Sequence, residues 1–583
     1  MTSRVDIFDI FKDISYICGM KQKIWKIIPQ RFRRRAIVVA ATIFLRALLN
    51  FVGVAMLLPI LLLIIDNGNI ESNSYLSSAY NTLGFTDYTS FTTALLLAIV
   101  GIIVVKNLSI LLLYRFERDF IYSLYKNLSE RLYVGYHQRG LGYVKRNNSA
   151  ILSRNVNVVS LQFVAGILKP IATILSELLL LLLIFGALLW YAPTAALLAI
   201  VVFLPIVALF YFGIRRRLNT IGEQENEAQR IKSRIVAETF RGYADIEISG
   251  AFPQMFKQFE EAMTEVVKYR KQNSTIGILP QMVTEIGLIV GMVTLIMLSL
   301  SGTFENIALM FGIFAVAAIR LIPSVRSIMS AWSSIRYNSY ALDTLADIDP
   351  SHEEPTFSTS TERFNLTNSI ELHDLCFTFD DAEHPTINHL NLTIHKGECL
   401  GIRGTSGVGK TTLFNLILGL YRPSSGRITI DGEELTDNNI RKWQNSVGYV
   451  SQSVFIADMT LAENITLGNN DNIDLSRLNQ AVEMADLTEF VATLPEGINT
   501  PIGELGARLS GGQRQRIGIA RALYKGADIL FFDEATSSLD NHTEENINNA
   551  IRRLSNTNSS LTIVVIAHRE SSLEYCNRRI TLE

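Results

Sequence analysis

The residue types and spacing with the clearest chemistry form a glycine-rich loop. Residues 404–411 read Gly-Thr-Ser-Gly-Val-Gly-Lys-Thr and match the phosphate-binding pattern G-x-x-x-x-G-K-[ST]. The loop follows an apolar strand at 399–402 and opens an apolar helix near 412, which is the context that the pattern requires. Glycines let backbone N–H groups wrap phosphates, and the helix N-terminus adds a favourable dipole. We expect Lys410 to reach the β- and γ-phosphates and the Thr411 hydroxyl to bind Mg²⁺.

An acid pair follows a second apolar strand, at 529–532. Asp533 and Glu534 end that strand, about 120 residues after the phosphate loop, and parallel strands end at one edge of a sheet. Asp533 is predicted to hold Mg²⁺, directly or through water, and Glu534 to accept a proton from the attacking water. The two motifs together predict hydrolysis of ATP with Mg²⁺.

A second anion-binding motif lies between them. Residues 509–513 read Leu-Ser-Gly-Gly-Gln and begin a helix that carries Arg514, Arg516 and Arg521. One nucleotide cannot occupy both motifs of a single compact domain. The economical arrangement is two domains that face head to tail, each motif closing on the other's ATP. The sequence therefore predicts a dimer.

Composition places part of the chain in lipid. The 583 residues are 48% apolar and only 19% charged, with a mean hydropathy of +0.24, whereas soluble domains carry about 25% charge. High apolar content excludes a disordered or collagen-like chain. The four cysteines, Cys18, Cys376, Cys399 and Cys576, form no CxxC; we expect small buried side chains in reducing compartments rather than a disulfide scaffold or a metal site. The net charge of −2 predicts no binding of nucleic acid.

Six apolar stretches before residue 350 are long enough to cross a bilayer core of about 30 Å. They lie near 36–65, 91–114, 168–190, 194–214, 276–300 and 305–325. Lys and Arg are absent from 66–90 and from both short turns, and they are abundant in the loops on the other side. The N-terminus and the C-terminal domain are therefore predicted to be cytoplasmic.

The segments between the spans carry further expectations. Residues 115–165 and 215–275 are charged and helix-compatible, and we expect them to extend the membrane helices into the cytoplasm. Apolar residues at helical spacing within 67–90 suggest a short amphipathic helix at the outer face, or else an ordinary polar loop. Residues 349–364 are rich in Ser, Thr, Glu and Pro, which predicts a linker between a transmembrane domain at 1–348 and a domain at 365–583 in which strands alternate with helices.

The chain resembles the ATP-binding cassette (ABC) exporters in their half-transporter form, one six-span membrane domain fused to one nucleotide-binding domain. The resemblance covers essentially the whole chain. It implies a membrane α-helical bundle of the type IV exporter fold joined to an α/β P-loop NTPase of the ABC type. It also implies coupling helices near 140–150 and 242–250, and an ATP hydrolase coupled to transport.

The resemblance assigns roles to further residues. Gln452 matches the glutamine that senses Mg²⁺, and His568 matches the histidine on the γ-phosphate; with Glu534 they form the expected catalytic set. Residues 538–540 match the D-loop, and 503–506 match the loop that touches the coupling helices. The expected nucleotide-binding residues are Phe379, Gly404, Thr405, Ser406, Gly407, Val408, Gly409, Lys410, Thr411, Thr412, Ser510, Gly511, Gly512 and Gln513, and the expected Mg²⁺ ligands are Thr411, Gln452 and Asp533.

Two positions depart from the family pattern, and none of the catalytic motifs is degenerate. Phe379 stands where the family usually has Tyr, and a phenyl ring still stacks on adenine. The chain stops at Glu583, without the usual closing helix, so the last edge of the domain is expected to be incomplete. Because both halves of the ATP site are competent in one chain, a homodimer is favoured over a heterodimer.

Ionisable residues within the apolar stretches suggest the cargo. Arg46, Lys106 and Arg320 are basic, and Glu177 and Glu285 are acidic. They either form buried ion pairs or line a cationic cavity for a phosphate or pyrophosphate headgroup. The pattern resembles the bacterial lipid-linked oligosaccharide flippases, which implies export of a polyprenyl-pyrophosphate glycan across the inner membrane with Arg46, Lys106 and Arg320 at the headgroup.

Other cargoes stay open. A lipid A or phospholipid flippase would also need basic residues, whereas a multidrug exporter would favour a neutral, aromatic or acidic cavity. A peptide exporter would need an N-terminal protease, for which only about 35 residues precede the first span. An importer or a soluble ATPase is disfavoured by six spans joined covalently to the cassette.

Overall fold

The computed structural model describes residues 22–56, 80–82, 84–85, 87–191, 193–300, 307–346, 361–467, 473–503, 509–534, 545, 549, 552, 561–567 and 569–583, apart from the side chains over much of 194–216 and at 307–320. The chain divides into two compact units. The first comprises Met1–Arg139 and Tyr143–Pro355, and the second comprises Gly140–Gly142 and Thr356–Glu583.

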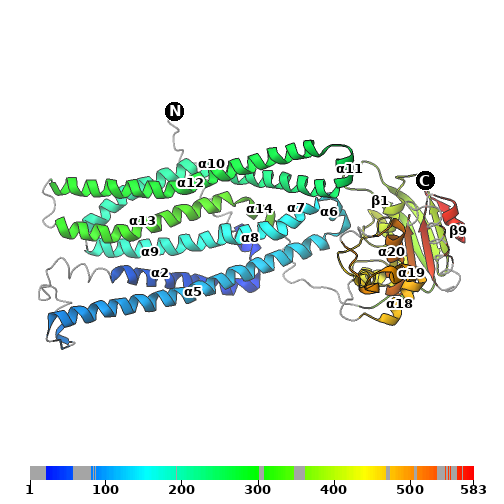
Figure 1. The fold of residues 1–583 in the computed structure, drawn as a ribbon, viewed down its shortest axis with the longest axis horizontal. Helices are drawn as coiled ribbons and strands as arrows, with labels where there is room; N and C mark the ends of the chain where they lie inside the picture. The colour runs from blue at the N-terminus through cyan, green and yellow to red at the C-terminus, as the bar shows by residue number, and fades with distance from the viewer. Residues whose placement is uncertain are drawn as a thin grey trace. The chain divides into compact units, whose positions relative to one another are not determined.

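The first unit is built from long helices that run side by side (Figure 1). The long helices are α2 (Gln30–Ala55), α5 (Tyr88–Gln138), α9 (Lys169–Tyr191), α10 (Pro193–Arg241), α12 (Phe252–Leu300) and α13 (Ile307–Tyr337). The short helices are α6 (Gly140–Arg146), whose first three residues belong to the second unit, α7 (Ser149–Arg154), α8 (Ser160–Phe163), α11 (Tyr243–Ile248) and α14 (Tyr340–Ala346), with π-helical turns at Asn155–Val159 and Val164–Leu168. Helices α6 and α11 lie at the two segments expected to hold coupling helices, and that role stays a prediction.

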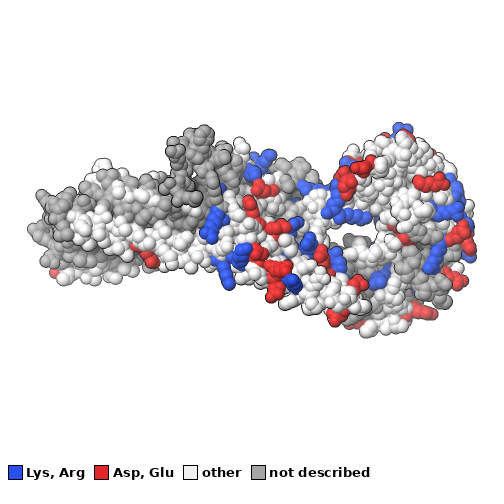
Figure 2. Space-filling model, turned by 90° about the horizontal axis from the view of Figure 1, so that it is seen from above, with Lys and Arg blue, Asp and Glu red and all other residues white. Residues whose placement is uncertain are grey.

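Four helical segments among the described residues are long and apolar enough to cross a membrane: Gln30–Ala55, Thr89–Gln138, Ser149–Trp190 and Phe252–Thr294. In α5, several apolar side chains from Leu97 to Leu112 are more than half exposed, which is stable only where the surroundings are apolar. On the face seen in Figure 2, the charged side chains of the first unit gather towards one end of its helices. The other two expected spans fall in α10 and α13, where many side chains are outside the described residues.

Part of the expected first span, and much of the segment that follows it, is not described. Residues 57–79 are outside the described residues, so the end of the first expected span and most of the expected amphipathic helix are untested. Asp87 caps the start of α5, where its carboxylate accepts a hydrogen bond from the backbone N–H of Ser90 at 3.1 Å. The cap marks the point at which the second membrane helix begins.

The second unit is a three-layer α/β domain. Its five-stranded parallel sheet has the order β6-β7-β8-β3-β9, formed by β3 (Cys399–Arg403), β6 (Val447–Val450), β7 (Ile529–Asp533), β8 (Thr562–Ile566) and β9 (Arg578–Thr581). A four-stranded antiparallel sheet has the order β2-β1-β4-β5, formed by β1 (Ser369–Phe377), β2 (Ile387–His395), β4 (Ser425–Ile430) and β5 (Glu433–Glu434). The helices are α15 (Lys410–Ile417), α16 (Ile440–Ser446), α17 (Leu461–Thr466), α18 (Leu475–Met484), α19 (Thr488–Thr493) and α20 (Gly511–Lys525).

The side chains of the central strand β7 point alternately into two hydrophobic cores, one on each face of the parallel sheet. Leu530 and Phe532 pack with α17, α18 and α20, whereas Ile529 and Phe531 pack on the opposite face with α15 and the antiparallel sheet. Successive residues of a strand point to opposite faces, so a continuous apolar run here indicates a sheet covered on both sides. Phe364, at the end of the expected linker, is buried against Trp443 in the second of these cores.

Candidate functional site

The glycine-rich loop joins β3 to α15 at the carboxyl end of the parallel sheet. Gly409 caps α15 with φ 101°, and a Cβ there would lie 3.0 Å from the carbonyl oxygen of Thr386. Only glycine fits this position without strain. Lys410 is buried, and its Nζ donates hydrogen bonds to the carbonyl oxygens of Gly404 and Thr405, both at 3.0 Å. The ammonium group is therefore held inside the loop where phosphates are expected to bind.

The hydroxyl of Thr411 and the carboxylate of Asp533 lie next to each other at the end of the phosphate-binding loop. The Thr411 hydroxyl donates to Asp533 Oδ1 at 3.1 Å, and the Tyr449 hydroxyl donates to Asp533 Oδ2 at 3.3 Å. Burial raises the pKa of Asp533, and the hydrogen bonds from Thr411 and Tyr449 partly offset that increase. A hydroxyl and a carboxylate oxygen are ligands suited to Mg²⁺, which usually completes its shell with water and substrate phosphates. Thr411 and Asp533 therefore fit the expected metal role.

Three segments distant in sequence bring their side chains together next to this pair. Glu534, which follows β7, has a left-handed φ of 48°. Gln452 Nε2 donates to Glu534 Oε2 at 2.9 Å, and Lys410 Nζ lies 4.0 Å from Glu534 Oε1. A carboxylate in this place can accept a proton from water, while Gln452 fixes its orientation. Non-glycine residues in this backbone region often mark functional sites.

The second anion-binding motif is a capped helix start. Ser510 accepts a hydrogen bond from the backbone N–H of Gln513 at 3.2 Å, and the Gln513 side chain accepts one from the backbone N–H of Ser510 at 2.8 Å. This capping box fixes the beginning of α20 at Gly511 and Gly512. Binding of a nucleotide by Ser510, Gly511, Gly512 and Gln513 stays a prediction.

Gln515 is a residue that the sequence analysis missed. Its Nε2 donates to the backbone oxygen of Gln452 at 2.7 Å, and the residue is 4% exposed. It couples α20 to the segment whose side chain contacts Glu534. The sequence carries one sign of this role: Gln515 is a polar residue on the apolar face of its helix, four positions before the buried Ile519.

We expect Gln515→Leu to lower kcat for ATP hydrolysis about tenfold, with little change in KM, because the segment that orients Glu534 loses its support. Steady-state ATPase kinetics measure both values. Gln444→Leu, on the distant α16, is the matched control. A higher KM with an unchanged kcat would contradict this positioning role.

Phe379 is half-buried, and its ring packs edge-on against Phe377 and Tyr421, with centroids 4.8 and 5.7 Å apart. Its stacking on adenine stays a prediction. His568, Glu504–Gly506 and the expected D-loop at 538–540 are outside the described residues. Their roles stay predictions as well.

The charged residues of the membrane helices have different surroundings. Arg46 pairs with Glu117 of α5 at 3.1 Å, and both side chains are largely buried. This partner is neither of the two acids considered from the sequence, since Glu117 lies just beyond the second apolar stretch. Lys106 lies over Gly53 of α2, where an added Cβ would approach its Nζ to 2.7 Å. The Arg320 side chain is outside the described residues.

The two acids engage polar neighbours. Glu177 accepts a hydrogen bond from the Ser324 hydroxyl at 2.6 Å, which joins α9 to α13. Glu285 accepts one from Gln281 on its own helix at 3.0 Å. The structure thus gives Arg46 an ion-pair partner, and binding of a headgroup by Arg46, Lys106 or Arg320 stays a prediction.

We expect Arg46→Met to destabilise the chain by about 3–5 kcal/mol, because Glu117 keeps a buried charge without its partner. Glu117 Oε1 already has no hydrogen-bond partner among the described residues. The double variant Arg46→Met/Glu117→Gln is expected to recover most of the loss. Thermal unfolding in detergent tests this expectation, and equal destabilisation of the single and double variants would contradict it.

The fold and this site define a P-loop ATPase unit joined to a membrane helical unit. The family model described as "ABC transporter" matches residues 387–537. The chain is 29% identical over 498 residues to an "ATP-dependent lipid A-core flippase" of Ralstonia nicotianae, covering 83% of this chain and 82% of the relative. It is 31% identical over 401 residues to a protein of the same name from Cupriavidus pinatubonensis, covering 68% and 67%.

A solved structure has the same fold. The ATP-bound structure of a bacterial Atm1-family ABC exporter superposes with a TM-score of 0.71 at 20% identity, covering 94% of this chain and 93% of that one. The chain belongs to the ABC transporters, in their exporter half-transporter form. It is a multi-pass membrane protein with the type IV exporter fold, and it binds ATP and couples its hydrolysis to transport. The expected family and fold class are confirmed, whereas lipid-linked oligosaccharide as cargo gains no specific support.

Proposed function

We propose that this protein flips a phosphate-bearing glycolipid of the lipid A class across the bacterial inner membrane. The observation that carries this proposal is the similarity, over two thirds or more of the chain, to relatives named lipid A-core flippases. A lipid A headgroup and the pyrophosphate of a lipid-linked oligosaccharide share one chemistry, an anionic phosphate attached to sugar. The second cargo therefore remains the competitor in the test.

The membrane helices offer a cation for such a headgroup. Lys106 lies near the middle of the apolar part of α5 and is half-buried next to Gly53. An ammonium group held in an apolar bundle is costly and favours an anionic ligand. Arg46 is neutralised by Glu117 and is left out of the proposed site, whereas Arg320 of α13 is kept in it.

The proposal includes two copies of the chain and a cytoplasmic ATPase unit. Both motifs for one composite ATP site are present in each chain, which supports a homodimer. The clustering of Lys and Arg on one side of the expected spans supports cytoplasmic placement of the nucleotide-binding unit. In the working site, Lys410 and the phosphate loop would hold the phosphates and Thr411 with Asp533 would hold Mg²⁺. Glu534 would take the proton of the attacking water, oriented by Gln452.

ATPase activity of the protein in liposomes, titrated with candidate lipids, tests the cargo. We expect lipid A to stimulate hydrolysis and Lys106→Ala or Arg320→Ala to reduce that stimulation about tenfold, as loss of charge-assisted hydrogen bonds predicts. Lys106→Arg should retain it, and Lys126→Ala, an exposed lysine further along α5, is the matched control. Stimulation only by a polyprenyl-pyrophosphate glycan, or only by hydrophobic drugs, would overturn the lipid A assignment.

A further inference from the structure

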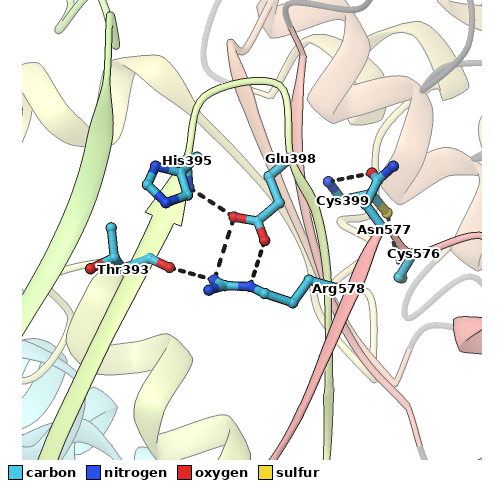
Figure 3. Close-up of polar contacts among 7 residues, drawn as sticks. All are labelled: Thr393, His395, Glu398, Cys399, Cys576, Asn577 and Arg578. Atoms are coloured by element: carbon cyan, nitrogen blue, oxygen red, sulfur yellow. Dashed lines mark hydrogen bonds and ion pairs between the residues drawn. The ribbon is translucent and has the colours of Figure 1, made fainter.

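Two cysteine thiols lie in contact inside the nucleotide-binding unit. Cys399 begins β3, and Cys576 lies two residues before β9; their sulfur atoms are 3.4 Å apart, although the residues are separated by 177 positions (Figure 3). Both are buried, with 1% and 8% of their surface exposed, in the core on one face of the parallel sheet. Cys376, in contrast, is only partly buried.

The backbone around the two thiols is held from both sides. The N–H of Cys399 donates to Asn577 Oδ1 at 3.1 Å, and the N–H of Asn577 donates to the oxygen of Cys399 at 2.8 Å. On the other side of Cys399, Glu398 pairs with Arg578 at 2.6 Å (Figure 3). A Cβ on Gly401 would lie 3.3 Å from the sulfur of Cys576, so the glycine leaves room for it. The thiols are thus kept facing each other across neighbouring strands.

We propose that Cys399 and Cys576 form a redox-sensitive dithiol, which peroxide closes to a disulfide that restrains the phosphate-loop strand. This inference is independent of the transported lipid. A disulfide needs a sulfur separation of about 2.05 Å, and the present contact requires only a small approach of the two side chains. The reduced form is the resting state in a reducing cytoplasm.

The two thiols have different tasks in the reaction. A hydrogen bond from the Cys399 thiol, together with the charge of Arg579, lowers the pKa of Cys576, whereas the pKa of Cys399 is raised by that hydrogen bond and by burial. Cys576 is also the more exposed of the two. Its thiolate attacks one peroxide oxygen and breaks the O–O bond, giving a sulfenic acid and water after protonation. The Cys399 sulfur then attacks the Cys576 sulfur, water leaves, and the two thiols have together given two electrons and two protons to peroxide.

The position of the pair connects it to ATP hydrolysis. Strand β3 runs from Cys399 directly into the phosphate loop at Gly404. The C-terminal segment runs alongside β3, where the N–H of Leu582 donates a hydrogen bond to the oxygen of Arg403 at 2.8 Å. A Cβ on Gly404 would lie 2.8 Å from the oxygen of Leu582, so the C-terminal segment passes close to the start of the phosphate loop. A disulfide would tie β3 to the C-terminal segment and so restrain the loop that holds Lys410.

The test uses the full-length chain in which Cys18 and Cys376 are replaced by Ser, leaving two of its four cysteines. After treatment with hydrogen peroxide, peptide mapping without reductant should find Cys399 and Cys576 linked within one chain, lighter by two hydrogens. ATPase activity should fall roughly tenfold, as expected when catalytic groups are misplaced, and dithiothreitol should restore it. Further replacement of Cys576 by Ser should prevent both effects.

Persistence of two free thiols, or oxidation of Cys576 to sulfinic acid without a link, would overturn the proposal. A link that leaves the ATPase rate unchanged would overturn its effect on the phosphate loop. The same peptide mapping can be done on the unsubstituted chain, because each of its four cysteines falls in a different tryptic peptide. The test therefore does not depend on correct folding of the variants.

Discussion

Glu534→Gln is expected to lower ATP hydrolysis by about 10²–10⁴-fold while leaving ATP binding intact. The amide has the shape of the carboxylate and can still accept the hydrogen bond that Gln452 Nε2 donates at 2.9 Å. It cannot take a proton from water. Neither Lys410 nor the loop carbonyls that it contacts are altered, so the phosphate-binding geometry is kept.

The measurement is phosphate release by the protein in liposomes, together with equilibrium binding of a fluorescent ATP analogue. Glu483→Gln, an exposed position on α18, removes the same charge at a distance from the site and should leave both values unchanged. Turnover at the unsubstituted rate in Glu534→Gln would refute the assignment of this residue as the base. Loss of binding in the same variant would mean that Glu534 holds the loop together instead.

Lys410→Ala is expected to weaken ATP binding about 100-fold, which corresponds to the loss of about 3 kcal/mol from charge-assisted hydrogen bonds to phosphate. In the structure, Nζ is held by the oxygens of Gly404 and Thr405. The buried ammonium group has no carboxylate closer than Glu534 Oε1, at 4.0 Å, among its described ion pairs. Its charge is therefore available for an anionic ligand.

Nucleotide titration measures this effect, with Lys396→Ala as a control that removes an exposed lysine from the turn before β3. Hydrolysis should fall in parallel with binding at low ATP. The two substitutions are expected to change different quantities: Glu534→Gln lowers the rate of hydrolysis of bound ATP, whereas Lys410→Ala lowers the fraction of sites that hold ATP. Unchanged ATP affinity in Lys410→Ala would remove the lysine from the phosphate site.

The ATP site could be read from the sequence because its parts are short and contiguous. The loop at 404–411, the acid pair at the end of β7 and the capped start of α20 each carry a local geometry that follows from residue type: glycine for a left-handed φ, a strand end for the acids, and Ser510 with Gln513 for the cap. The apolar stretches were equally local, because the length needed to cross a bilayer is a property of one segment.

Contacts between distant segments could not be read in this way. The sequence marks Arg46 as a costly charge in an apolar stretch, but its partner Glu117 lies on a neighbouring helix, beyond the apolar stretches. Gln515 resembled an ordinary helix residue until packing placed its side chain against the backbone of Gln452. Both pairs depend on how helices and loops pack, which no local pattern specifies.

The class of this protein follows from local features of one chain: a phosphate loop, an acid pair, a second anion motif and long apolar segments. These motifs are defined by residue types and by short spacings along the chain, which folding does not change. Packing of the folded chain, in contrast, sets which charges neutralise each other, which side chain orients Glu534, and that Cys399 and Cys576 meet. The strand order β6-β7-β8-β3-β9 places β3 between β8 and β9, which are far from it in sequence. Such long-range pairing is set by burial of the whole sheet.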